Sequence, residues 1–242
     1  MNKAPSLALD SQPSSTRAHG LIERYSEANV PTEYGAFRVV VYREHRRSGG
    51  FDDHVAMIVG DVSGEDVLVR VHSECLTGEV MHSLKCDCRE QLDRGMHAVA
   101  TEKRGVVMYL RQEGRGIGLG EKIRAYALQE RGADTVDANR MLGLPDDARR
   151  YHVAAFMCRD LGIDSMQLLT NNPDKVRKLR EEGIPVHQRV PVYIEPNVHN
   201  VEYLLTKSRR MHHELDIEGA AENENEIDAA VNDAEDADGN AE

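Results

Sequence analysis

The sequence predicts a mixed α/β fold, in which helices flank a mixed sheet and the N-terminal part is richer in strands. Runs of β-branched residues are concentrated between residues 37 and 72, whereas short apolar runs alternate with helical stretches between residues 88 and 190. Gly, Pro and Asp separate most of these segments. Hydrophobic residues make up 40% of the 242, slightly fewer than in an average domain, so part of the chain is expected to stay outside the core.

Each element is predicted from its local pattern. The polar residues 1–30 are expected to form a flexible extension, with a short helical stretch near 20–28, and an ordered domain is expected over 31–215. Gly132 and Gly162 end two of the expected helices. The expected strands are 37–42, 54–59, 67–72, 106–110, 166–170 and 185–190. The expected helices are 88–103, 119–131, 148–161, 173–182 and 199–214.

The charge is unevenly distributed. The net charge is −12, but residues 216–242 alone carry 11 acidic residues and no Lys or Arg, which leaves 31 acidic and 30 basic residues elsewhere. We expect that segment to be a disordered acidic tail, because it has too little apolar surface to offset its ordering entropy. The balanced body disfavours nucleic-acid binding. The absence of long apolar runs and of a secretory signal pattern predicts no membrane association and a cytoplasmic location.

Three of the four cysteines lie close together in the sequence. Cys75 follows the strand expected at 67–72, and Cys86 and Cys88 form a C-x-C pair ten residues later. A turn over 76–85 would bring the three sulfurs together as zinc ligands, leaving the fourth tetrahedral position open for water or closed by His72 or His82. The alternative is three ordinary buried or reactive thiols. Cys158, on an apolar helix face, is expected to pack in the core.

Two further segments have the residues of a phosphate site. Arg111-Gln112-Glu113-Gly114-Arg115-Gly116 follows an expected strand, and its amides and guanidinium groups suit a phosphate chain, while Glu113 could accept from the N–H edge of a guanine. Thr170-Asn171-Asn172-Pro173-Asp174-Lys175 passes from a strand into a helix and offers a hydroxyl, amides and an ammonium. Surface turns with solvated cations are equally typical of both segments. Tyr126 has the helical spacing of a core tyrosine.

Five blocks together resemble a known family. They are Arg70-Val71-His72-Ser73-Glu74-Cys75-Leu76-Thr77-Gly78, Ser83-Leu84-Lys85-Cys86-Asp87-Cys88, Tyr109-Leu110-Arg111-Gln112-Glu113-Gly114-Arg115-Gly116-Ile117-Gly118, Lys122-Ile123-Arg124-Ala125-Tyr126-Ala127-Leu128-Gln129 and Leu168-Leu169-Thr170-Asn171-Asn172-Pro173. In order and spacing these blocks resemble GTP cyclohydrolase II over roughly residues 31–210. The resemblance implies a monofunctional, homodimeric, zinc-dependent catalytic domain of that fold.

The reaction that the resemblance implies is the first step of riboflavin biosynthesis. GTP would be hydrolysed to formate, pyrophosphate and 2,5-diamino-6-(5-phosphoribosylamino)pyrimidin-4(3H)-one, with Mg²⁺ on the triphosphate. The implied zinc ligands are Cys75, Cys86 and Cys88. The implied GTP contacts are Arg70, Val71, His72, Ser73, Glu74, Gln91, Glu113, Gly114, Arg115, Thr135, Thr170 and Lys175.

Three catalytic roles are also implied by the resemblance. Tyr126 would assist ring opening, Asp147 would accept a proton, and Arg149 would be a nucleophile on the α-phosphate. An arginine with a pKa above about 12 is a poor nucleophile, so stabilisation of phosphoryl charge by Arg149 is the physically easier role. Two alternatives remain: a paralogue that stops at the formamidopyrimidine, which Tyr126 disfavours, and a non-catalytic sensor of zinc and GTP.

Overall fold

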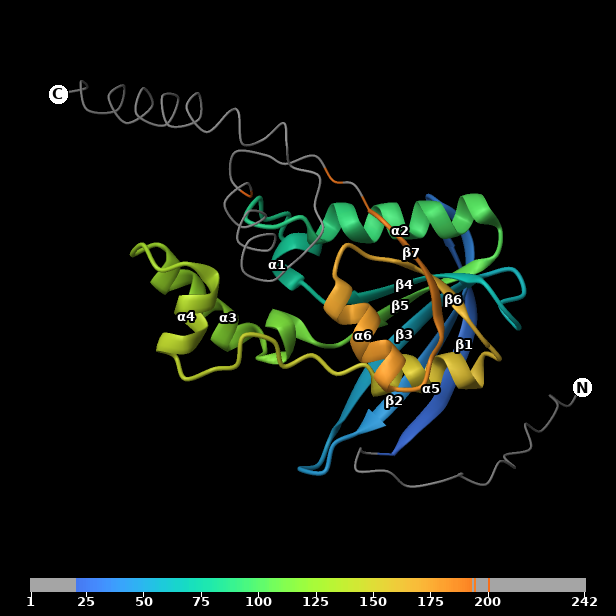
Figure 1. The fold of residues 1–242 in the computed structure, drawn as a ribbon, viewed down its shortest axis with the longest axis horizontal. Helices are drawn as coiled ribbons and strands as arrows, with labels where there is room; N and C mark the ends of the chain where they lie inside the picture. Colours follow the sequence, from blue (N-terminus) through green and yellow to red (C-terminus); the bar gives the residue numbers. More distant parts are fainter. Residues whose placement is uncertain (1–20, 193, 195–199, 201–242) are drawn as a thin grey trace, which may run out of the picture.

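One mixed β-sheet organises the part of the chain that the computed structural model describes, which comprises residues 21–192, 194 and 200 (Figure 1). Its strand order is β1-β2-β3-β5-β4-β6-β7. The pairs from β1 through β3 to β5 are antiparallel, and those from β5 through β4 and β6 to β7 are parallel. The strands are β1 (Ile22–Thr32), β2 (Gly35–His45), β3 (Phe51–Val59), β4 (Val67–Ser73), β5 (Gly105–Leu110), β6 (Met166–Leu169) and β7 (Val186–Val190).

Helices cover both faces of the sheet (Figure 1). One face packs Phe37 and Val107 against Val99 of α2, and the other packs Val106 and Met108 against α5 and α6. Successive side chains of β5 therefore point to opposite faces of the sheet, and both faces are buried. The helices are α1 (Leu76–Glu79), α2 (Cys88–Glu102), η1 (Glu113–Gly116, a 3₁₀ turn), α3 (Leu119–Gln129), α4 (Thr135–Met141), α5 (His152–Asp160) and α6 (Pro173–Glu181).

The mixed α/β prediction is confirmed. The strands expected at 37–42, 54–59 and 67–72 lie within β2, β3 and β4, and every other element expected between residues 88 and 190 is present with shifted ends. Three short elements, α1, η1 and α4, had not been expected. Asp134 caps α4 by accepting from the backbone N–H groups of Val136 and Asp137.

The prediction for the N-terminal segment is wrong. Residues 22–28 of the expected helical stretch belong instead to β1, so the ordered body begins before residue 31 and the flexible extension cannot reach residue 30. Most side chains of β1 are exposed, so its sequence lacks the apolar periodicity that would predict a strand. Its backbone pairing with β2 holds it in the sheet. The described residues do not include residues 1–20, the expected helix at 199–214 (apart from position 200) or the acidic tail at 216–242.

Among the residues that the structure describes, no helix combines the length and the apolar character needed to cross a bilayer.

Candidate active site

The carboxyl ends of the parallel strands β4, β5 and β6 meet at one edge of the sheet, and the loops that follow them enclose a cavity. This edge is where α/β sheets usually bind ligands. Helix α3 lies to one side of the sheet (Figure 1), and its residues Lys122, Ala125, Tyr126 and Gln129 are part of the cavity lining. The lining includes Arg70, His72, Ser73, Glu74, Cys75, Cys86, Cys88, Gln91, Glu113, Gly114, Arg115, Lys122, Tyr126, Arg149, Asn171, Asn172, Thr170 and Lys175.

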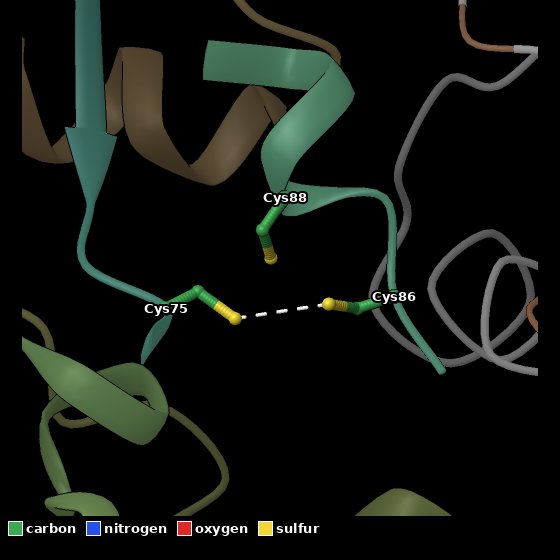
Figure 2. Close-up of side chains that lie close together, drawn as sticks. All are labelled: Cys75, Cys86 and Cys88. Carbon is green, nitrogen blue, oxygen red and sulfur yellow. Dashed lines mark hydrogen bonds between the residues drawn. The ribbon is translucent and has the colours of Figure 1, made fainter. Parts of the chain in front are cut away.

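The three cysteines converge at this cavity (Figure 2). Their sulfur atoms all lie within 4.8 Å of one another, and Cys75 Sγ is 3.7 Å from Cys86 Sγ. A tetrahedral zinc with Zn–S bonds of about 2.3 Å holds its sulfurs about 3.8 Å apart, so this spacing fits the ion. Among the described residues no other Cys, His or carboxylate joins the cluster.

Local structure explains why the sulfurs converge. Cys75 immediately precedes α1, and Cys88 is the first residue of α2 (Figure 2). The segment from α1 to α2 returns the chain, as the expected turn over 76–85 requires. Gly78 makes the close approach possible: a Cβ there would lie 2.8 Å from Cys86 Sγ and 3.3 Å from Cys75 Sγ. Because Gly78 has no side chain, the three sulfurs can lie this close together, and this close arrangement suits a metal centre better than three unrelated thiols.

The electrostatics of the cluster also call for a cation. Hydrogen bonds from the neighbouring thiols of Cys86 and Cys88 lower the pKa of Cys75 well below its usual range. The hydrogen bond with Cys75 raises the pKa of Cys86 to about 11, and the hydrogen bonds with Cys75 and Cys86 raise the pKa of Cys88 well above its usual value. Three thiolates this close together repel one another, so their joint ionisation needs a nearby positive charge. A divalent cation would let all three ionise.

Neither histidine considered as a fourth ligand contacts the sulfur cluster. His72 Nε2 lies 2.7 Å from Glu79 Oε1, and Glu79 Oε2 accepts from Tyr109 Oη at 2.5 Å. Burial lowers the pKa of His72, so its imidazole is neutral and presents Nδ1 on the side of Arg70, whose Nη2 is 3.5 Å away. His82 is exposed, and its Nδ1 is 2.5 Å from Arg89 Nη1. Among the described residues, therefore, neither of these histidines is placed to act as a fourth ligand beside the three sulfurs.

A buried arginine belongs to the same cavity as the three cysteines. Arg70 is 4% exposed; its Nη1 donates to the Leu169 carbonyl at 3.0 Å, and its Nη2 donates to Gln91 Oε1. Burial lowers the pKa of Arg70. Arg70 Nε and the Oγ of Ser73 have no hydrogen-bond partner among the described residues. Buried donors of this kind are typical of a site that a polar ligand completes.

Glu113 has a different environment from the one its sequence context suggested. Its Oε2 accepts from Leu76 N at 2.6 Å, and its Oε1 accepts from Gly114 N at 2.8 Å and from Lys122 Nζ at 2.9 Å. These bonds tie η1 to α1 and α3, so the carboxylate is already occupied on both oxygens. The sequence did not indicate Lys122 as a site residue. Although burial lowers its pKa, the hydrogen bond that Lys122 donates to Glu113 leaves the net pKa of Lys122 raised, so it is cationic.

The η1 turn places the backbone of Gly114 and the side chain of Arg115 at the cavity. Gly114 and Arg115 both adopt left-handed conformations, with φ of 60° and 58°. A left-handed conformation is costly for an arginine, and such strain is found mostly at functional sites. Both residues line the cavity, as the phosphate-site interpretation of this segment requires.

Asp147 and Arg149 form a tight pair. Arg149 Nε and Nη2 each donate to the Asp147 carboxylate at 2.9 Å, and Lys178 Nζ lies 3.3 Å from Asp147 Oδ2. Burial raises the pKa of Asp147, but the hydrogen bonds and charge of Arg149, with Lys178, outweigh burial and hold it well below its usual range. Arg149 lines the cavity, whereas Asp147 is not part of the lining.

The second phosphate-site segment also reaches the cavity. Thr170, directly after β6, and Lys175, in the first turn of α6, are buried, and Lys175 Nζ donates to the Val71 carbonyl at 2.7 Å. Asn172 caps α6 by accepting from Asp174 N at 2.9 Å, so the helix N-terminus is on the cavity side. The side chain of Val71 is fully buried, and Val71 contributes here through its backbone carbonyl, which accepts the hydrogen bond from Lys175. The side chain of Thr135 lies outside the described residues.

Tyr126 lines the cavity and is not a core residue. Its helical neighbours Leu119 and Ile123 are 36% and 48% exposed, so the face that the spacing suggested as core is not buried among the described residues. The Nζ of Lys122 lies 5.7 Å from the Tyr126 ring centroid. The residues that the sequence did not indicate but the cavity includes are Ile117, Lys122, Ala125, Gln129, Asn139 and Val192, whereas Asn171 and Asn172 belong to the second expected phosphate segment.

Comparison with known proteins gives consistent matches. The chain is 48% identical over 199 residues to GTP cyclohydrolase-2 of Actinobacillus succinogenes, covering 79% of this chain and 88% of the relative. It is 49% identical over 194 residues to GTP cyclohydrolase-2 of Neisseria meningitidis, covering 80% and 96%. It is also 52% identical over 202 residues to riboflavin biosynthesis protein RibBA of Mycobacteroides abscessus, covering 80% and 47%. The chain thus spans about half the length of the RibBA relatives that it matches.

A family model, described as GTP cyclohydrolase II, matches residues 23–191. The match begins within β1 and ends just after β7, so it covers the sheet except Ile22 and every residue of the cavity except Val192. With most of the chain matched, and with two relatives near half identity covered almost end to end, this chain belongs to the GTP cyclohydrolase II family.

Proposed function

We propose that this chain is a zinc-dependent GTP cyclohydrolase II of riboflavin biosynthesis. It would open the imidazole ring of GTP, release formate and pyrophosphate, and form 2,5-diamino-6-(5-phosphoribosylamino)pyrimidin-4(3H)-one. The main support is one observation: three convergent sulfurs and a set of phosphate-binding groups line the same cavity. That combination suits a ligand with a hydrolysable ring at one end and a triphosphate at the other.

Cys75, Cys86 and Cys88 would hold the zinc, whose Lewis acidity lowers the pKa of water toward neutrality. The open side of the sulfur cluster belongs to the cavity that Tyr126 lines. Tyr126 would donate a proton to the imidazole nitrogen that leaves as the ring opens. Neutral His72, held by Glu79, and buried Arg70 would orient the nucleotide beside the metal.

Arg115, Lys175 and the N-terminus of α6, which belong to the lining of the same cavity, would bind the phosphate chain together with Mg²⁺. Thr170 and Asn172 supply neighbouring polar groups. Val71 contributes by anchoring Lys175 through its carbonyl. Thr135, Gln91 and Glu74 remain proposed GTP contacts.

For Arg149 we propose electrostatic stabilisation of the α-phosphoryl group. A nucleophilic role needs Asp147 to remove a guanidinium proton. The ordinary pKa values of Asp and Arg differ by about 9 units, which is about 12 kcal/mol against that transfer. The lowered pKa of Asp147 widens the gap. Asp147 instead orients the guanidinium by holding Nε and Nη2, as buried carboxylates commonly do.

The homodimer, the magnesium ion and the cytoplasmic location remain predictions. In support of a homodimer, Val80, Met81 and Leu84, on the segment between α1 and α2, are 68%, 65% and 55% exposed, and a second copy would cover this apolar surface. Light scattering of the full chain tests this proposal.

The experiment that tests the proposed function is incubation with GTP and Mg²⁺, following formate, pyrophosphate and the pyrimidine together, with and without a chelator. We expect all three products, and their loss on zinc removal. The Cys86→Ala variant should lose zinc and formate release, whereas Cys158→Ala, which removes a buried thiol outside the cluster, should retain both. GTP left intact by zinc-loaded protein would indicate a sensor, and a formamide product without formate would indicate the paralogue.

A further inference from the structure

Lys122 is the only lysine among the described residues with its ammonium in hydrogen-bond contact with a cysteine of the metal cluster. Its Nζ lies 3.1 Å from Cys75 Sγ, 2.8 Å from Thr77 Oγ1 and 2.9 Å from Glu113 Oε1, and its side chain is 11% exposed. An ammonium has three N–H donors, and these three acceptors use all of them. Although Lys122 lines the cavity, it has no donor left for a phosphate or a base.

The charges around Lys122 explain its position. Three thiolates and one Zn²⁺ carry a net charge of −1, and the neighbouring Glu113 carboxylate adds another negative charge in a mostly buried environment. Lys122 is placed between the two groups and contacts both. Burying two such negative groups without a cation would be strongly unfavourable. The ammonium therefore offsets the excess of negative charge that three sulfur ligands bring to the metal.

We propose that Lys122 is a positioning residue that tunes the metal through Cys75. A hydrogen bond to a thiolate draws electron density away from the sulfur, so the sulfur donates less charge to the metal and the metal stays more electrophilic. Lys122 thereby counters the electron-rich character of a three-cysteine site. It also fixes α3 against the cluster, and Tyr126 lies one helical turn further along the same face.

The test uses the full chain with Co²⁺ in place of zinc and without GTP. The thiolate-to-cobalt charge-transfer band reports how strongly the sulfur holds its lone pair, which a nearby ammonium stabilises. Lys122→Met should therefore move the band to longer wavelength and weaken zinc binding about 10- to 100-fold in competition with a chelator. Lys122→Arg, which keeps the charge and the donors, should hold the band close to its wild-type position.

Two further variants complete the design. Lys103→Met removes an exposed lysine at the end of α2 and should leave the band unmoved. Lys122→Gln keeps a donor without the charge and should give an intermediate shift, so it carries the test if Lys122→Met does not fold. A band at the wild-type wavelength in a folded Met or Gln variant overturns the inference, whatever happens to turnover.

This inference rests on the proposed metal centre, and the two fail differently. A wild-type chain that shows no thiolate-to-cobalt band contradicts the metal centre itself. A wild-type chain that shows the band, with Lys122 variants that leave it unmoved, contradicts only the role of Lys122.

Discussion

Gly78→Ala places one methyl group against the metal cluster. The added Cβ would lie 2.8 Å from Cys86 Sγ and 3.3 Å from both Cys75 Sγ and Cys88 Cβ. The optimal separation of such atoms is about 3.5–4.0 Å, so Cys86 would have to move by about 1 Å. Gly78 is buried, and its φ is not positive, so the clash is the main source of strain.

The size of the effect follows from the tolerance of a metal site. Metal–ligand distances hold within about 0.2 Å, several times less than the displacement that the methyl group imposes. We expect zinc affinity to fall at least about 100-fold, which corresponds to about 2.7 kcal/mol. The metal-free fold should lose less, because overpacking costs about 1–3 kcal/mol and Ala recovers about 1 kcal/mol of helix propensity.

The assay is chelator competition for zinc, combined with urea unfolding with and without the metal. Gly120→Ala is the matched control, because a Cβ there meets nothing within 4 Å and the site is exposed on α3. It should bind zinc like the wild type and unfold at slightly higher urea concentration. If Gly78→Ala binds zinc within about threefold of the wild type, the sulfurs are not held in the arrangement described here.

Three other predictions concern single side chains of the cavity. Arg149→Lys should slow pyrophosphate release about 10- to 100-fold and Arg149→Met by about 10³-fold or more; equal inactivity of the two would favour a nucleophile. Tyr126→Phe should slow formate release about 10²- to 10⁴-fold at unchanged zinc content, and undiminished release would refute its role. Because burial lowers the pKa of His72, its stabilising contribution is present above about pH 6.5 and is lost as the pH falls below that value. The unfolding free energy of the wild type should fall from pH 7 to pH 5, and His72→Gln should reduce the slope of that fall by up to about 1.4 kcal/mol per pH unit. The exposed control His97→Gln should keep the wild-type slope. If His72→Gln and the wild type show the same slope, the role of His72 is contradicted.

The sequence carries enough information to predict the sheet and the metal cluster. Runs such as Phe37-Arg38-Val39-Val40-Val41-Tyr42 have the β-branched composition of a strand, and they are strands. A turn between Cys75 and Cys86 brings the chain back toward Cys75, so the three sulfurs are expected to lie close together, and they do. In these cases the signal is local in the sequence.

The features that were missed depend on contacts between distant segments. β1 is polar and exposed, so only its backbone pairing with β2 makes it a strand. Lys122 reaches Cys75 because α3 folds over the cluster, a contact across 47 residues that no local pattern encodes. Glu113 looked available to a base because its partners, the Leu76 amide and Lys122, belong to other elements.

The metal centre is tested most directly by X-ray absorption at the zinc edge on the metal-loaded chain without GTP. We expect three sulfur ligands at about 2.3 Å and one lighter ligand at about 2.0–2.1 Å that exchanges with added small anions. Fewer than three sulfurs, or a fourth ligand identified as a protein side chain, would contradict this expectation.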